Sequence, residues 1–223
     1  MDLLGNVYVA DTGNKRIRVF DVEGGHLYDI GSGGAGEGQL NEPAGIAIHP
    51  DGRLFIADTW NRRVAVFSQE GAHLYNFEVR GWYDELGNRP YLAVDPERDL
   101  VYVTDPDAGR VLIYNTAGEC VSSFGQYNQQ APNRSQFATV GGIAVDDEGN
   151  VYVTDFASGR VLRFDPYEPP VSAEVDSGQI VEDGMPADSA ADEESEVTPE
   201  LSPEVSADVN SAPEITEEPG VDD

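Results

Sequence analysis

One sequence element, present in four copies, constrains the fold of this chain more than any other feature. It consists of an alternating apolar run, an Asp, four further residues, an Arg and a second alternating run. The first copy reads GNVYVADTGNKRIRVF, and the four Asp–Arg pairs are Asp11 and Arg16, Asp58 and Arg63, Asp105 and Arg110, and Asp155 and Arg160. The Asp residues are 47, 47 and 50 positions apart. Self-similarity with such a period is typical of solenoids and propellers.

Each unit divides into short strands separated by turns. In the first unit, Val7 and Val9 alternate with Tyr8 in the period-two pattern of a half-buried strand. The second unit adds a strand at its front, over 44–49, which ends in the turn at 50–52. The four units then contain three, four, four and three strands, and no helical periodicity is evident in 1–170. Four short antiparallel strands per unit predict a propeller blade.

The repeats resemble a known family. The strings PAGIAIHPDGRLFIADTWNRRVAVF and GGIAVDDEGNVYVTDFASGRVLRF are similar to NHL repeats, and GSGGAGEGQLNEPAGIAI resembles the junction between two such blades. This resemblance covers roughly residues 1–166 and implies an all-β fold, a β-propeller, usually of about six blades in that family. We therefore expect residues 1–168 to form NHL-type propeller blades.

The number of strands departs from the family pattern. The first unit begins at its second strand and the last lacks its outermost strand, so fourteen strands give a partial ring. A partial ring exposes blade faces that closure would cover. We therefore expect further blades upstream of Met1 or self-association that closes the ring, and an unusual four-bladed ring is the alternative.

The C-terminal segment has a different composition. Residues 171–223 contain 17 Asp and Glu, no Lys or Arg and no aromatic residue, whereas residues 1–170 have a net charge of −12. Such a segment buries too little apolar surface to offset chain entropy. The sequence therefore predicts an acidic, Pro-containing disordered tail over 169–223. We expect a solubilising tail or linker, with a recruitment motif or weak cation binding as alternatives.

The sequence contains few features that point to a compartment. Cys120 is the single cysteine, so no internal disulfide forms, and its place within a predicted strand favours a buried, inert thiol. No run of 18 apolar residues occurs, and the first five residues do not resemble a signal peptide. If the chain is part of a longer protein, an extracytoplasmic or cell-surface location is favoured.

The Asp–Arg element is interpreted as structural. The Asp ends one strand and the Arg begins the next antiparallel strand, so the two side chains face each other across a hairpin loop. An Asp in this place can accept loop N–H groups and pair with the guanidinium, often in bidentate fashion. Catalytic sites are rarely repeated in every unit of a fold, so no catalytic residue is predicted here.

No cofactor or metal site is predicted. The Gly-rich run at 31–38 is followed by another strand rather than a helix, which favours a blade linker over a phosphate loop. His26 and His73 lie on separate outer strands and His49 lies at a strand end, so a three-His zinc site, as in amidating lyases that share this kind of propeller, is not formed. A lactonase-like calcium site would need carboxylates that converge on the channel.

The loops that follow each Asp differ between units and emerge on the same side as the blade linkers. Variable loops on a rigid scaffold commonly bind ligands, and exposed Trp, Tyr and Arg side chains anchor partners. The candidate ligand-binding residues are Trp60, Arg62, Trp82, Tyr83, Tyr127 and Phe156. The alternative is that these aromatic side chains pack over the blade tops.

The predicted function is that of a non-enzymatic binding or scaffolding module that engages a protein or glycan through this loop face. A net charge of −12 opposes nucleic-acid binding. The enzymatic alternative is a C-terminal fragment of a metal-dependent lyase or lactonase, whose site lies mostly on missing blades.

Overall fold

The computed structural model describes residues 1–82, 89–131, 133 and 135–168. The predicted tail at 169–223 and candidate residue Tyr83 lie outside these described residues. The described residues belong to one compact unit. The described part of the chain is built from β-strands with two short 3₁₀ helices, which confirms the all-β prediction.

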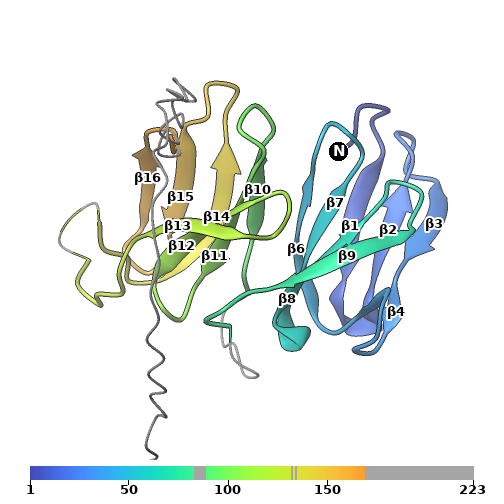
Figure 1. The fold of residues 1–223 in the computed structure, drawn as a ribbon, viewed down its shortest axis with the longest axis horizontal. Coiled ribbons are helices and arrows are strands. Elements are labelled where there is room, and N and C mark those ends of the chain that lie inside the picture. The colour runs from blue at the N-terminus through green and yellow to red at the C-terminus, as the bar shows by residue number, and fades with distance from the viewer. Residues whose placement is uncertain (83–88, 132, 134, 169–223) are drawn as a thin grey trace, which may run out of the picture. The chain divides into compact units, whose positions relative to one another are not determined.

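The strands follow one another along the chain with short connections (Figure 1). The first eight and the helices between them are β1 (Val7–Asp11), η1 (Thr12–Asn14), β2 (Arg16–Phe20), β3 (His26–Ile30), β4 (Ser32–Gly33), β5 (Gln39–Leu40), β6 (Pro43–Ile48), β7 (Leu54–Asp58), η2 (Thr59–Asn61) and β8 (Arg63–Phe67). The remaining strands are β9 (His73–Glu78), β10 (Leu92–Asp95), β11 (Leu100–Asp105), β12 (Arg110–Asn115), β13 (Cys120–Phe124), β14 (Val140–Val145), β15 (Val151–Asp155) and β16 (Arg160–Phe164).

Four antiparallel sheets, named here blades 1 to 4, take their strands in chain order. Blade 1 contains β1-β2-β3, blade 2 contains β6-β7-β8-β9, blade 3 contains β10-β11-β12-β13, and blade 4 contains β14-β15-β16. The short parallel pair β4 and β5 lies in the linker between blades 1 and 2, where the Gly-rich run was predicted to be a linker. The distribution of three, four, four and three blade strands is the one predicted from the repeats.

The blades bury their apolar faces against one another. In blade 2, Leu54 and Ile56 contribute to a core shared with blade 1, whereas Phe55 and Ala57 contribute to a core shared with blade 3. A third core joins blades 3 and 4 around Tyr102. Successive side chains of a strand point to opposite faces, so a strand between two blades must be apolar at every position. Each such fully buried side chain contributes about 1.5–3 kcal/mol.

The inner strands of neighbouring blades lie against each other: β6 contacts β10, and β10 contacts β14. This close approach explains Gly45, where an added Cβ would lie 2.8 Å from Tyr91 Cα.

One detail of the core differs from prediction. Cys120 begins β13 with its side chain exposed, so the prediction of a buried thiol is wrong. Outer strands contact one neighbour only, and alternation alone does not distinguish their two faces.

Candidate functional site

The structure joins each repeated Asp to its Arg across the hairpin between the second and third strands. The Nε atom of the Arg donates to the Asp Oδ2 atom at 2.8–2.9 Å in the first three pairs. In the fourth pair, Arg160 donates through Nη2 at 2.8 Å. The carboxylates of Asp58, Asp105 and Asp155 are fully buried. These pairs are not bidentate, because the remaining guanidinium donors bond elsewhere.

Those remaining donors hold the linker that enters the blade. Arg63 donates through Nη2 to the carbonyls of Gly36 and Gln39, at 2.9 and 2.8 Å. Arg160 bonds the equivalent residues of its own linker, with Nη1 to the Asn133 carbonyl at 3.3 Å and Nη2 to the Gln136 carbonyl at 2.9 Å. We call each of the four Asp–Arg pairs a clamp, because in blades 2 and 4 the pair fixes a linker to a hairpin.

In blades 2 and 4, the Asp of the clamp also receives N–H groups from the same linker. The Asn41 N–H donates to Asp58 Oδ1 at 2.5 Å, and the N–H groups of Ala138 and Thr139 donate to Asp155 at 3.1 and 2.9 Å. Burial alone would raise the pKa of Asp155. Hydrogen bonds from Ser158, Thr139, Arg160 and Ala138 outweigh burial and lower this pKa to about 2. The carboxylate of Asp155 is thus held in its charged form.

The hairpins beside the clamps have a conformation that most side chains disfavour. The residue four positions after the Asp is left-handed in every blade, with φ values of 57° at Lys15, 55° at Arg62, 61° at Gly109 and 65° at Gly159. Glycine adopts this region without a Cβ clash, whereas the same region is unfavourable for other L-residues. A non-glycine residue held in this region motivates a functional hypothesis, and both such residues here are cations on the same loop face.

Three of the predicted aromatic residues are exposed on this loop face. The exposed fractions are 50% for Trp60 in η2, 53% for Tyr127 in the linker after blade 3, and 65% for Phe156 after β15. Their backbones are fixed by hydrogen bonds to the linker or hairpin. The N–H groups of Trp60, Tyr127 and Phe156 donate to the carbonyls of Asn41, Ala108 and Thr139, respectively.

Trp82 differs from the expectation that both tryptophans are exposed. Its side chain is 2% exposed and belongs to the core between blades 2 and 3. Its indole Nε1–H donates to the Thr104 carbonyl at 3.2 Å. Trp82 is therefore packed rather than exposed, as in the alternative that the aromatic side chains pack over the blade tops, although it lies in the core between two blades. Tyr83 lies outside the described residues.

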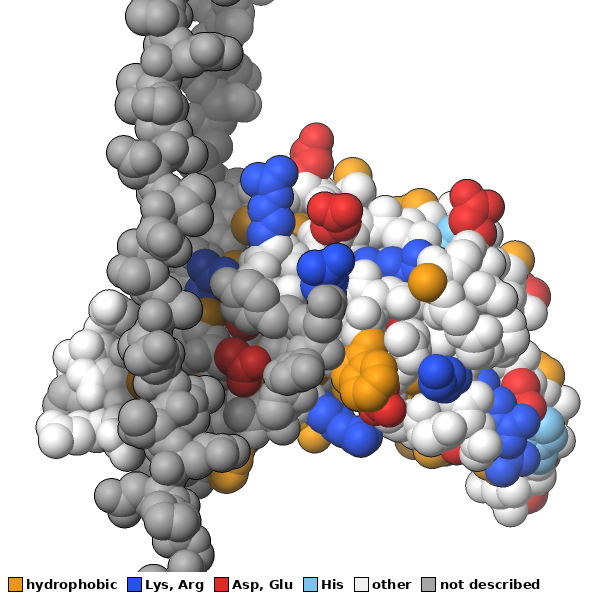
Figure 2. All heavy atoms as spheres, turned by 90° about the horizontal axis from the view of Figure 1, so that it is seen from below, with side chains coloured by type: hydrophobic (Ala, Val, Ile, Leu, Met, Phe, Trp, Pro, Cys, Tyr) orange, Lys and Arg blue, Asp and Glu red, His pale blue; other side chains and the backbone are white. Residues whose placement is uncertain are grey.

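A groove borders Arg62 on the loop face. It has a volume of about 300 Å³ and is lined by Asn61, Arg62, Glu78, Arg80 and Trp82, among others. A second groove of about 570 Å³ shares Glu78 and Arg80 with it and extends along the boundary between blades 2 and 3. Figure 2 shows the face that lies below in Figure 1, where Lys and Arg side chains are scattered around hydrophobic ones. Asp and Glu side chains lie among them, so this face combines cationic, acidic and hydrophobic groups.

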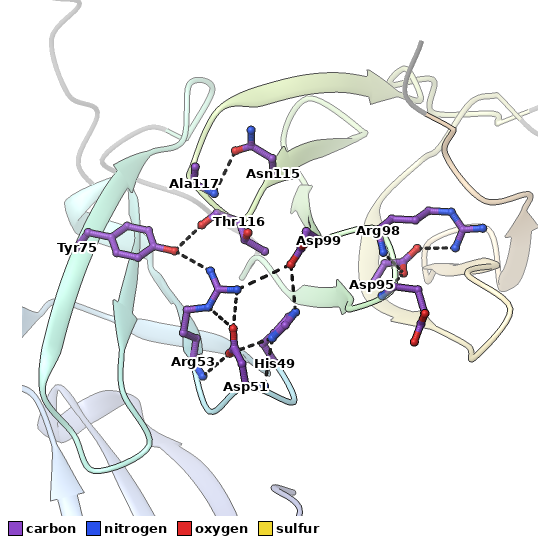
Figure 3. Close-up of polar contacts among 11 residues, drawn as sticks. His49, Asp51, Arg53, Tyr75, Asp95, Arg98, Asp99, Asn115, Thr116 and Ala117 are labelled. Atoms are coloured by element: carbon purple, nitrogen blue, oxygen red, sulfur yellow. Dashed lines mark hydrogen bonds and ion pairs between the residues drawn. The ribbon is translucent and has the colours of Figure 1, made fainter. Parts of the chain in front are cut away.

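A polar network joins blades 2 and 3 at the opposite ends of the strands (Figure 3). His49 Nδ1 accepts the Asp51 N–H at 3.2 Å, and His49 Nε2 lies 3.6 Å from Asp99 Oδ1. Arg53 Nε donates to Asp51 Oδ2 at 2.7 Å. Burial would raise the pKa of Asp51, but hydrogen bonds from the Arg53 side chain and N–H lower it to about 2. This network was not predicted from the sequence.

A structural role for His49 follows from the other blades. The position nine residues before the clamp Asp is Asp2 in blade 1 and Asp146 in blade 4, and each accepts the N–H two residues later. His49 accepts the corresponding N–H in blade 2, so its imidazole caps a turn.

Within the described ranges, no group of three His, Cys, Asp or Glu residues could hold a metal ion. The described residues also include no helix that could span a membrane.

Comparison with known proteins identifies the repeats. The model of the NHL repeat family matches residues 40–67 and 137–164, which cover the inner three strands of blades 2 and 4. This confirms the prediction from the repeats: the chain contains NHL repeats at these two positions and builds them as β-propeller blades. No curated protein sequence matches the chain closely.

Solved structures share the fold at low sequence identity. Virginiamycin B lyase from Staphylococcus aureus is 14% identical with a TM-score of 0.52, over 76% of this chain and 55% of the lyase. A streptogramin B lyase is 15% identical with a TM-score of 0.51, over 75% and 53% of the two chains. A chain of a nidogen/laminin complex is 20% identical with a TM-score of 0.52, over 72% and 55%. This chain thus spans about half the length of the structures it resembles.

Proposed function

We propose that this protein is a non-enzymatic binding or scaffolding module that engages a protein or glycan through its loop face. The observation that carries the proposal is the exposure of Trp60, Tyr127 and Phe156 on hairpins and linkers whose backbones are fixed by hydrogen bonds. Large aromatic side chains on an immobilised backbone lose little conformational freedom on binding. Trp and Tyr are also the residues that most often dominate binding energy.

Arg62 supports the same surface. It directly follows η2, which carries Trp60, and it lines the groove of about 300 Å³. Arg62 has a left-handed backbone, and the equivalent residues of blades 3 and 4 are glycines. A side chain at this position therefore comes at a conformational cost. A guanidinium beside an exposed indole suits a ligand that offers both acceptor oxygens and an apolar or sugar face.

The enzymatic alternative is a metal-dependent lyase or lactonase. Two lyase structures share the fold of this chain, but at 14 and 15% identity this likeness concerns the fold alone. Elemental analysis of the purified full chain would favour this alternative if it found stoichiometric Zn²⁺ or Ca²⁺. Loss of that metal should then change thermal stability.

The binding proposal can be tested without knowledge of the natural ligand. Phage-displayed peptides and a glycan array would be screened against the full chain, and the selected ligands titrated against single variants. We expect Trp60→Ala, Arg62→Ala and Phe156→Ala each to weaken binding by about tenfold or more. Leu27→Ala and Leu74→Ala are matched controls, because both side chains are exposed on outer strands away from the loop face. Ligands that respond equally to the controls, or to none of the loop variants, would refute the proposal.

A further inference from the structure

The Asp11–Arg16 clamp of blade 1 differs from the other clamps in what it holds. The Asp11 side chain is 22% exposed, whereas the equivalent carboxylates in blades 2, 3 and 4 are fully buried. Arg16 directs Nη1 to Asp29 Oδ2 at 2.7 Å rather than to linker carbonyls. Asp11 Oδ1 accepts from the Asn14 side chain at 2.8 Å and from no linker N–H among the described residues. The blade 1 clamp therefore has the same hydrogen-bonding groups as the other clamps, but no linker segment of the described chain is bound to them.

The strand that such a segment leads into has no counterpart in blade 1. In blade 2, β6 pairs with β7 through Pro43 opposite Asp58 and Ile48 opposite Leu54. In blade 4, β14 pairs with β15 in the same register and with the same irregularity. The first strand of blade 1 is β1, the equivalent of β7 and β15, which pairs with β2 alone and leaves its other edge open within the described residues. An open strand edge presents unpaired N–H and C=O groups that another strand can join.

Blades 2 and 4 define the sequence that fits this arrangement. Residues 39–48 read QLNEPAGIAI and residues 136–145 read QFATVGGIAV. In both copies the first residue is a Gln whose carbonyl accepts from the clamp Arg, and the second, Leu40 or Phe137, is fully buried. Gly45 and Gly142 precede the shared Ile-Ala pair. At Gly45 a Cβ would lie within 3.0 Å of three backbone atoms of the adjacent segment, so glycine is required there.

We propose that the β1 edge and the Asp11–Arg16 clamp form a docking site for an extended peptide segment of this pattern: Gln, a large apolar residue, two variable residues, Pro or Val, a small residue, and Gly-Ile-Ala followed by Ile or Val. The segment would add a fourth strand to blade 1 by β-augmentation. Its Gln carbonyl would accept from Arg16, and an N–H two residues later would donate to Asp11, as in blades 2 and 4. The added strand would lie beside β6, which β1 already contacts.

The test uses the full chain and a fluorescein-labelled peptide with the sequence of residues 36–48. We expect a saturable rise in anisotropy, and slower hydrogen exchange in β1 (Val7–Asp11) when the peptide is bound. A peptide that differs only by Gly45→Val serves as the matched control and should not bind. Arg16→Ala should weaken binding by about tenfold or more, because it removes a charge-assisted contact.

Two further variants distinguish docking at the β1 edge from peptide binding elsewhere on the chain. Arg160→Ala removes a clamp already filled by its own linker, so it should leave the peptide affinity unchanged. Arg16→Lys retains the charge without the forked geometry and should give an intermediate loss. The proposal would be overturned if the Gly45→Val peptide bound equally well, or if no saturable binding were found. It would also be overturned if Arg16→Ala had no effect, or if slower hydrogen exchange were confined to β16 (Arg160–Phe164).

Discussion

Replacing Asp58 by alanine removes the central acceptor of the blade 2 clamp. The buried carboxylate accepts from the Asn41 N–H at 2.5 Å, from Asn61 Nδ2 at 2.8 Å and from Arg63 Nε at 2.8 Å. Its loss leaves a linker N–H and part of a guanidinium without an acceptor. Removal of one partner of a buried ion pair costs about 3–5 kcal/mol. Because Arg63 keeps its bonds to linker carbonyls, we expect a cost near the lower limit, about 3 kcal/mol.

The matched variant is Asp11→Ala. Asp11 occupies the same position in blade 1, but its side chain is partly exposed and it holds no linker within the described part of the chain. The Arg16 and Asn14 hydrogen bonds lower the pKa of Asp11, so the variant does remove a favourable interaction. We expect its effect on stability to be clearly smaller than that of Asp58→Ala, because surface ion pairs contribute little.

Both variants can be measured by urea and thermal unfolding of the full chain, followed by tryptophan fluorescence and circular dichroism. For a domain of this size, about 3 kcal/mol corresponds to a fall in Tm of about 6–12 °C. Coincident transitions by the two probes would justify a two-state analysis. Equal destabilisation by Asp58→Ala and Asp11→Ala would refute the reasoning, because it would show that the clamp acts only through its own Asp and Arg. A cost below about 1 kcal/mol for Asp58→Ala would do the same.

Three further outcomes are expected. Arg62→Gly should raise the free energy of unfolding, measured in urea, by up to about 1 kcal/mol. The reason is that Arg62 has a left-handed backbone, and the equivalent residue of blade 3, Gly109, is a glycine. A loss of stability would contradict this. Acrylamide should quench the fluorescence of Trp82→Phe more strongly than that of Trp60→Phe, because Trp60 is exposed and Trp82 is buried; the reverse order would contradict the assigned environments. Asp155→Asn should lower the free energy of unfolding by about 2 kcal/mol more at pH 7 than at pH 2. A pKa lowered from 3.8 to about 2 stabilises the fold above pH 4, and this stabilisation is lost on acidification. An equal loss at both pH values in urea unfolding would contradict this.

The fold could be predicted because its information is repeated and local. The apolar alternation before each Asp, the turns and the position of the Asp–Arg pair recur in register, and each copy supports the others. A continuous apolar run such as 54–57 is explained by blades on both sides of the strand. The prediction of fourteen blade strands in four units therefore required no long-range contact.

The features that sequence did not predict depend on contacts between blades. Trp82 is buried because its indole reaches the Thr104 carbonyl on β11, and a linker Trp offers no local sign of that contact. The sequence also gives no sign of the hydrogen bonds from Arg63 to linker carbonyls, because every residue carries a backbone carbonyl. The left-handed residue of each hairpin was detectable, because alignment of the four units places Gly109 and Gly159 opposite Lys15 and Arg62.

The clamps also determine how the chain would respond to tension. Each linker carries the chain from one blade to the next, and the clamp ties that linker to the hairpin of the blade it enters. A force along the chain would therefore load the clamp before it reached the strands behind it, and a blade would open only after its clamp released. Successive clamps are 47 to 50 residues apart, so each release would lengthen the chain by up to about 160 Å. A bound partner that covers the loop face would sit directly over these release points.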